Sequence, residues 1–283
     1  MAYTVPLSGE NPGYIIILID QSGSMGDPFG GNAGGTKAQE CAKAVNRVLR
    51  ELGMACVSGE TIKNRCDISV IGYGNSGDRA YNAFTGNLAN KPIVNMQELA
   101  KNALRVETLK VKVSDGAGGL VEQNEPFPVW IEPIDSGGTP MTQAFEMADQ
   151  LANDWSKNHP NSFPPVVINI TDGEPNDQSS AKTAALKLKQ LGTNDGKVLV
   201  LNAHITSKRA ARVELPPSAS DLPNGDNYAQ FLFDISSELP PVMLERASAV
   251  GFEVSAGSRG FVYNADAETM IRLLDIGTKA KLR

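Results

Sequence analysis

Short apolar runs alternate with stretches of helical periodicity along most of the chain. Residues 14–20, YIIILID, are almost continuously apolar, which is typical of a strand buried on both faces. Residues 37–53 carry apolar side chains at spacings of three and four and end in a glycine, which predicts an amphipathic helix. The same alternation continues toward the C-terminus. It predicts an α/β fold with an open, mostly parallel, Rossmann-like sheet and helices on both faces.

The remaining elements follow from the same patterns. Further strands are expected at 66–74, 79–84 (short, at the sheet edge), 164–173, 197–206 and 259–265. Further helices are expected at 95–104, 139–158, 179–192, 241–250 and 266–282. Residues 229–235, AQFLFDI, are expected to form a strand or a loop.

A β-hairpin is expected within the chain at residues 106–132, because apolar and polar residues alternate on both sides of SDGAGG. Two strands alone are too short to bury a core of their own. We therefore expect a single domain over residues 1–283, with the hairpin inserted at about 106–132.

Composition and charge exclude several classes of protein. The net charge of −6 and the lack of a basic patch argue against binding of nucleic acid. No apolar run approaches the roughly 18 to 20 residues that span a bilayer, and the first residues do not resemble a secretory signal. Cys41, Cys56 and Cys66 have no CxxC spacing and fit reduced thiols. We expect a cytoplasmic protein that binds neither nucleic acid nor membrane.

Oxygen-bearing side chains follow two predicted strands and precede a predicted helix. DQSGS (20–24) ends the first strand, TDGEP (171–175) ends a later strand, and GGTP (137–140) leads into the helix at 139–158. Carboxyl ends of parallel strands meet at one edge of a sheet, so these segments are expected to converge there. The candidate metal ligands in them are Asp20, Ser22, Ser24, Thr139 and Asp172.

This set contains only hard oxygen donors, with no histidine or cysteine. Such donors favour Mg²⁺, with Mn²⁺ and Ca²⁺ as alternatives, over zinc or copper. Three neutral hydroxyls and two carboxylates would leave the shell of about six ligands incomplete. We therefore expect one coordination position that faces solvent.

The pattern D-x-S-x-S, with a distant threonine and a distant aspartate, resembles the metal-ion-dependent adhesion site (MIDAS) of the von Willebrand factor A (VWA) family. All five positions match, and the order of the segments fits most of the chain. The resemblance implies that Ser22, Ser24 and Thr139 bind the metal through their hydroxyls. Asp20 and Asp172 would act directly or through water, and a partner's Asp or Glu would take the open position.

The resemblance also implies a switch in which direct ligation passes between threonine and aspartate as the partner binds. The last helix, expected at 266–282, would then move.

The function expected from these features is a non-enzymatic, metal-dependent protein-interaction module. The chain is similar to the stand-alone bacterial cytosolic members of the family, which implies a signalling or stress-response complex. The implied partners include Ser/Thr protein kinases, PP2C-class phosphatases and tellurite-resistance systems.

Two other functions remain open. The first is an aspartyl-nucleophile phosphotransferase of haloacid-dehalogenase type, with Asp20 as the nucleophile. That chemistry needs a second acid two residues later, where this chain has Ser22. The second is a metal-site subunit of an AAA-type ATPase machine.

Ordinary structural roles compete with ligation. The serine hydroxyls and Thr139 could cap helices, and Asp172 could form an Asx-turn. Residues 30–37, GGNAGGTK, lack the Gly-Lys-Ser/Thr order of a phosphate loop and are expected to form a loop at the rim of the site. Glu174 and Asp177 are expected to be solvated loop charges.

The two histidines are expected to have ordinary roles as well. His159 lies in a polar loop and His204 follows an apolar strand, so surface and core positions are favoured over catalysis.

Overall fold

The computed structural model describes residues 2–31, 35–75, 77, 79–114, 119–206 and 211–279. The strands of the main sheet are β1 (Gly13–Gln21), β4 (Cys66–Gly74), β5 (Arg79–Asn82), β6 (Val94–Asn95), β9 (Val166–Thr171), β10 (Leu199–His204), β11 (Val213–Glu214) and β12 (Phe261–Tyr263). Two small separate sheets are formed by β2 (Val57–Ser58) with β3 (Thr61–Ile62), and by β7 (Arg105–Ser114) with β8 (Leu120–Val129). The helices are α1 (Lys37–Ala55), α2 (Met96–Lys101), α3 (Met141–Asn158), α4 (Gln178–Leu188), α5 (Asn227–Ile235), α6 (Pro241–Ala249) and α7 (Ala267–Lys279).

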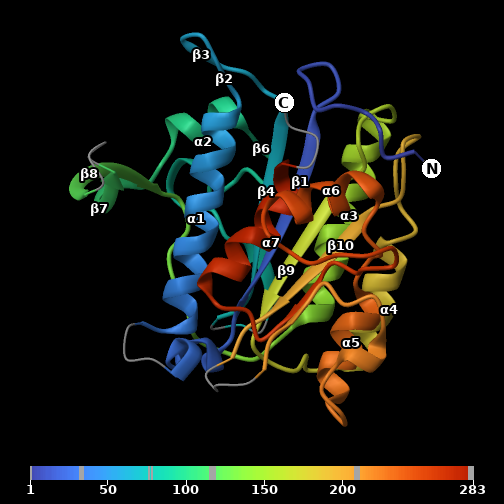
Figure 1. Ribbon diagram of the computed structural model, residues 1–283. Coiled ribbons are helices and arrows are strands. Elements are labelled where there is room, and N and C mark those ends of the chain that lie inside the picture. The colour runs from blue at the N-terminus through green and yellow to red at the C-terminus, as the bar shows by residue number, and fades with distance from the viewer. Residues whose placement is uncertain are drawn as a thin grey trace.

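The main sheet has the strand order β11-β12-β10-β9-β1-β4-β5, with β6 also paired to β4. The inner pairs β12–β10, β10–β9, β9–β1 and β1–β4 are parallel. The outer strands β5, β6 and β11 pair antiparallel. Helices cover both faces (Figure 1). The prediction of a mostly parallel α/β sheet is therefore confirmed.

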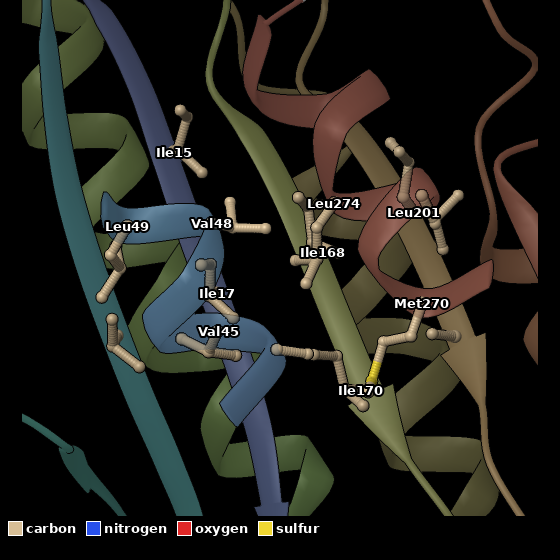
Figure 2. Packing of buried hydrophobic residues seen from close by; sticks show 14 of the residues in the cluster. Ile15, Ile17, Val45, Val48, Leu49, Ile168, Ile170, Leu201, Met270 and Leu274 are labelled. Atoms are coloured by element: carbon tan, nitrogen blue, oxygen red, sulfur yellow. The ribbon is translucent and has the colours of Figure 1, made fainter. Parts of the chain in front are cut away.

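Alternate side chains of the central strand β1 point to opposite faces of the sheet. Ile15 and Ile17 belong to the hydrophobic cluster on one face, together with residues of α1 and α7; Figure 2 shows them near Val48 of α1, while Met270 of α7 lies beside Ile170 of β9. Ile16 packs on the other face, in a cluster formed with α3, α4 and α5. Each face of the strand therefore has its own hydrophobic core, which explains why the run is continuously apolar.

β1 comes first in the chain but lies in the middle of the sheet. The chain continues to β4 on one side of β1 and only later to β9 on the other side. In open α/β sheets such a reversal creates a crevice beyond the carboxyl ends of the strands. This edge is the lower one in Figure 1, where the loop after β1 leads into the N-terminus of α1.

Residues 229–235 belong to helix α5, so the expected strand or loop is wrong at this position. The Asp226 carboxylate caps the helix by accepting hydrogen bonds from the backbone N–H groups of Tyr228 (3.0 Å) and Ala229 (2.8 Å). Most residues of α5 are buried, on more than one side of the helix. The polar residues Asn227, Gln230 and Asp234 recur at spacings of three and four and form the less buried side of the helix, a helical period that the short apolar run 231–233 obscures.

The expected hairpin is present as β7 and β8, and it projects to the side of α1 (Figure 1). Residues 115–118 of its expected turn lie outside the described residues. The chain after β8 is anchored by Asn46 of α1, whose Oδ1 accepts the backbone N–H groups of Trp130 (2.8 Å) and Ile131 (3.0 Å). The Trp130 indole donates to the Leu99 carbonyl (2.8 Å). Trp130 therefore packs in the core.

Among the described residues, no helix is both long enough and apolar enough to cross a membrane.

Candidate metal centre

Asp20 lies at the end of β1, and its side chain is fully buried. Oδ1 accepts a hydrogen bond from the backbone N–H of Ser22 (3.0 Å). Oδ2 accepts one from the hydroxyl of Thr171 (2.7 Å), the last residue of the neighbouring strand β9. Two adjacent strands therefore fix the orientation of this carboxylate.

Burial, together with the nearby charge of Asp172, raises the pKa of Asp20 to about 6, although the hydrogen bonds from Ser22 and Thr171 act in the opposite direction. The carboxylate is still ionised at neutral pH. A buried carboxylate without a full counter-charge is costly, so a cation at this position would be stabilised.

The hydroxyls of Ser22 and Ser24 connect the segment DQSGS (20–24) to the segment TDGEP (171–175). The two hydroxyl oxygens lie 3.1 Å apart, and the Ser24 hydroxyl donates to Asp172 Oδ1 (2.9 Å). A 3₁₀ turn over Gly23–Gly26 makes the chain double back after β1 and allows this contact. The loops after β1 and β9 therefore meet, as the order of the parallel strands predicts.

Thr139 reaches the same edge because the segment before α3 is hydrogen-bonded to both loops. The Gly23 N–H donates to the Gly137 carbonyl (3.0 Å). The Thr139 N–H donates to the side-chain carbonyl of Asn176, just beyond β9 (2.9 Å). The position of Thr139 thus depends on hydrogen bonds from its segment to two other segments.

Gly173 reveals how closely three of the oxygens approach one another. A β-carbon placed on residue 173 would lie 3.6 Å from Ser24 Oγ, 3.6 Å from Thr139 Oγ1 and 3.9 Å from Asp20 Oδ2. Oxygens from three separate segments therefore line one small cradle that the glycine leaves open. The structure thus places all five predicted side chains together, with Ser22 and Asp172 linked to the cradle through Ser24.

The capping alternatives do not account for these hydroxyls. Within the described part of the chain, the Ser22 side chain, at the N-cap of the 3₁₀ turn over Gly23–Gly26, accepts no capping hydrogen bond, and the N-cap residue of α3 is Pro140 rather than Thr139. Asp177 does have a capping role, because its carboxylate accepts the backbone N–H groups of Ser179 (3.0 Å) and Ser180 (3.1 Å) at the start of α4. Asp177 is therefore a helix cap rather than a simple loop charge.

Lys37 is a charged residue of this site that sequence reasoning missed, as it missed the supporting residue Thr171. It is the first residue of α1 and only 3% exposed. Its ammonium group forms an ion pair with Asp172 Oδ2 and lies 3.4 Å from Asp27 Oδ2. Because a helix N-terminus repels positive charge, a lysine at this position signals a nearby anion that compensates for it. Lys37 is the last residue of the stretch GGNAGGTK (30–37), which is expected to form a loop at the rim of the site. Residues 32–34 of this stretch lie outside the described residues.

No cluster of three or more His, Cys, Asp or Glu side chains that could hold a metal occurs in the described ranges. The candidate centre instead combines two carboxylates with three hydroxyls. A site with this composition suits a hard cation rather than Zn²⁺.

His204 lies at the end of β10, on the same edge of the sheet. It is 8% exposed, its ring stacks on Tyr263 at 4.7 Å, and its Nδ1 accepts the backbone N–H of Asn264 (3.3 Å). Burial lowers the pKa of His204 to about 4, although the charge of Asp226 acts in the opposite direction. His204 therefore has the core role expected for it.

We expect His204 to lower stability in acid. The folded pKa of about 4 lies below the unfolded value of 6.5. Between these values the unfolded chain binds more protons, so stability falls as pH falls. The full loss is about 3 kcal/mol. In the metal-free protein the raised pKa of Asp20 has the opposite effect over part of this range, stabilising the fold as pH falls through about 6. The prediction therefore concerns the difference between wild type and His204→Phe.

The measurement is urea unfolding with chelator at several pH values between about 7 and 4. The stability of His204→Phe relative to wild type should rise steadily toward the acid end. A constant difference between the two proteins over this range would contradict the prediction.

Comparisons with known proteins give no family assignment. No family model matches the chain, and no curated protein matches it. Similar solved structures include the manganese-loaded TRAP protein of Plasmodium vivax (16% identity, covering 82% of this chain and 65% of that chain, TM-score 0.39). They also include the vWF domain of the pilus tip protein Mfa5 from Porphyromonas gingivalis (15%, 58% and 39%, TM-score 0.32). A third is the ArnB paralog VWA2 from Sulfolobus acidocaldarius (13%, 70% and 36%, TM-score 0.33).

This chain therefore spans less than two thirds of the length of each of these three proteins. Two of the three have a vWF or VWA domain in their names. At these identities and TM-scores the likeness carries no functional argument.

Proposed function

We propose that this chain is a VWA-type interaction module that binds a partner's Asp or Glu carboxylate through a divalent cation. The convergence of oxygens from three distant segments on the cradle beside Gly173 is the observation that carries this proposal. The residues that would hold the cation are Asp20, Ser22, Ser24, Thr139 and Asp172.

The chemistry of these residues fits Mg²⁺, with Mn²⁺ or Ca²⁺ as alternatives. Asp20 contributes a buried negative charge whose orientation Thr171 fixes. Most of the other donors are neutral hydroxyls, which leave the charge of a divalent cation only partly compensated. A bound cation would supply an electrophilic centre to which an incoming carboxylate could bind with charge assistance.

We further propose that the site has no phosphotransferase activity. Both oxygens of Asp20 already accept hydrogen bonds, and its side chain is fully buried, which disfavours nucleophilic attack by this group. The position that would hold the general acid is Ser22.

The cellular setting is also part of the proposal. Cys41, Cys56 and Cys66 are buried free thiols, which fits a reducing cytoplasm. By the family resemblance we propose a signalling or stress-response complex, with a Ser/Thr kinase or a PP2C-class phosphatase as the kind of partner to seek.

The proposal is tested with Mn²⁺, whose binding is followed by calorimetry and by electron paramagnetic resonance. We expect one bound ion per chain and an affinity at least about tenfold lower in Ser22→Ala, because a ligand is lost. A protein captured from the native host in Mg²⁺ should be released by chelator and should not bind Ser22→Ala.

Ser220→Ala is the matched control, since Ser220 is exposed in a 3₁₀ turn over Ala219–Asp221. Equal Mn²⁺ affinity in wild type and Ser22→Ala would count against the proposal. Hydrolysis of p-nitrophenyl phosphate that disappears in Asp20→Asn would favour the phosphotransferase instead.

A further inference from the structure

Lys37 places a buried ammonium group beside the proposed ligand Asp172. The side chains of both residues are almost inaccessible, at 4% and 0% exposure. The pairing is built into the fold, because the Lys37 N–H donates to the Asp27 carbonyl (3.0 Å) and Thr36 caps α1 just before it. The backbone from which the lysine side chain extends is therefore held in place beside Asp172.

The two oxygens of Asp172 have different partners. Oδ2 is paired with the Lys37 ammonium, while Oδ1 accepts the Ser24 hydroxyl (2.9 Å) and faces the hydroxyl cluster. One aspartate thus connects an internal cation to the side chains proposed to hold a metal. Asp27, the other carboxylate near Lys37, has a side chain 58% exposed and is screened by water.

We propose that Lys37 is a built-in counter-cation that weakens divalent-metal binding and makes the metal-loaded site cationic. This inference rests on the proposed function, because it concerns the same site. Asp20 and Asp172 with Lys37 leave one net negative charge at the site. A divalent cation converts that into one net positive charge, which a single incoming carboxylate neutralises. Without the lysine, the loaded site would already be neutral.

Two consequences follow from this charge count. Without metal, Lys37 stabilises the site by compensating Asp172, which would otherwise be an unpaired buried charge. With metal, its repulsion lowers the affinity for the cation and raises the attraction for an anionic partner. Lys37 therefore couples occupation of the metal site to recognition of a carboxylate.

The test compares Mn²⁺ binding by wild type and by Lys37→Met, which keeps most of the side-chain volume without the charge. Calorimetry should show an affinity at least about tenfold higher in the variant, since a like charge has been removed from beside the site. The melting temperature of metal-free Lys37→Met should be lower than that of metal-free wild type. Saturating Mn²⁺ should raise the melting temperature of Lys37→Met by more than it raises that of wild type.

Lys37→Gln provides a second variant if Lys37→Met does not fold without metal, because its amide can still donate to Asp172. Lys43→Met is the control, as Lys43 lies on the same helix with a side chain 59% exposed and should leave the affinity unchanged.

Mn²⁺ affinity in both Lys37 variants equal to or below that of wild type would overturn the inference and leave the proposed function standing. Binding by the variants but not by wild type would support the inference and overturn the proposed function. Absence of binding in all of these proteins would overturn both.

Discussion

Replacing Asp20 with asparagine is expected to lower Mn²⁺ affinity by about 100-fold or more, equivalent to about 2.7 kcal/mol. Asp20 supplies a buried charge at the centre of the proposed ligands, and its oxygens are oriented by Ser22 and Thr171. Asparagine has nearly the same shape and keeps one oxygen acceptor. The variant therefore tests the charge of the side chain more than its volume, and calorimetry with Mn²⁺ measures the effect.

The same substitution should leave the metal-free protein folded and no less stable near neutral pH. Burial raises the pKa of Asp20 to about 6, so its ionised form is less favourable in the folded protein than in the unfolded chain. Asparagine removes that cost, and its Nδ2 can donate to the Thr171 hydroxyl oxygen while that hydroxyl donates to the Gly173 carbonyl (3.2 Å). Asp154→Asn, at a carboxylate with 74% exposure, is the control and should bind Mn²⁺ like wild type. Unchanged affinity in Asp20→Asn would remove Asp20 from the ligand set.

The parts of the fold that could be predicted are those in which one pattern dominates. β1 is apolar on both faces because both faces are packed, and this pattern predicts a central parallel strand. The candidate ligands could be predicted to converge because parallel strands bring their carboxyl ends to one edge. Helix α5 was missed because it is only nine residues long, so its polar positions Asn227, Gln230 and Asp234 give a helical period over barely two turns, interrupted by the apolar run 231–233.

The residues that support the candidate ligands were harder to find. Thr171 ends an apolar strand, and its contact with Asp20 depends on the register between β1 and β9. Lys37 lies at the start of α1, and its partner Asp172 is far away in the sequence. Local patterns carry no information about such pairs, apart from the unfavourable placement of a cation at a helix N-terminus.

Gly137→Ala is expected to have the largest effect on stability, a loss of about 4 kcal/mol. Gly137 has φ of +83°, and a β-carbon there would lie 2.1 Å from the Asn75 carbonyl oxygen and 2.9 Å from its carbonyl carbon. Those are backbone atoms, so no rotamer change can relieve the overlap. The loop must shift, and the Gly23 N–H, which donates to the Gly137 carbonyl (3.0 Å), must shift with it.

Movement of this loop should also weaken metal binding, because Thr139 lies only two residues after Gly137 and would be displaced with it. Urea unfolding with chelator measures the stability, and Mn²⁺ calorimetry below the transition measures the affinity. The control is Gly225→Ala, with φ of +77° and no atom within 4 Å of an added β-carbon. Gly225→Ala should lower the free energy of unfolding by only about 1 to 2 kcal/mol, because only the left-handed backbone conformation is unfavourable for alanine. It should not change the Mn²⁺ affinity. Equal losses of stability in the two variants would contradict the expected overlap with Asn75. Unchanged Mn²⁺ affinity in Gly137→Ala would mean that this loop does not determine the position of Thr139.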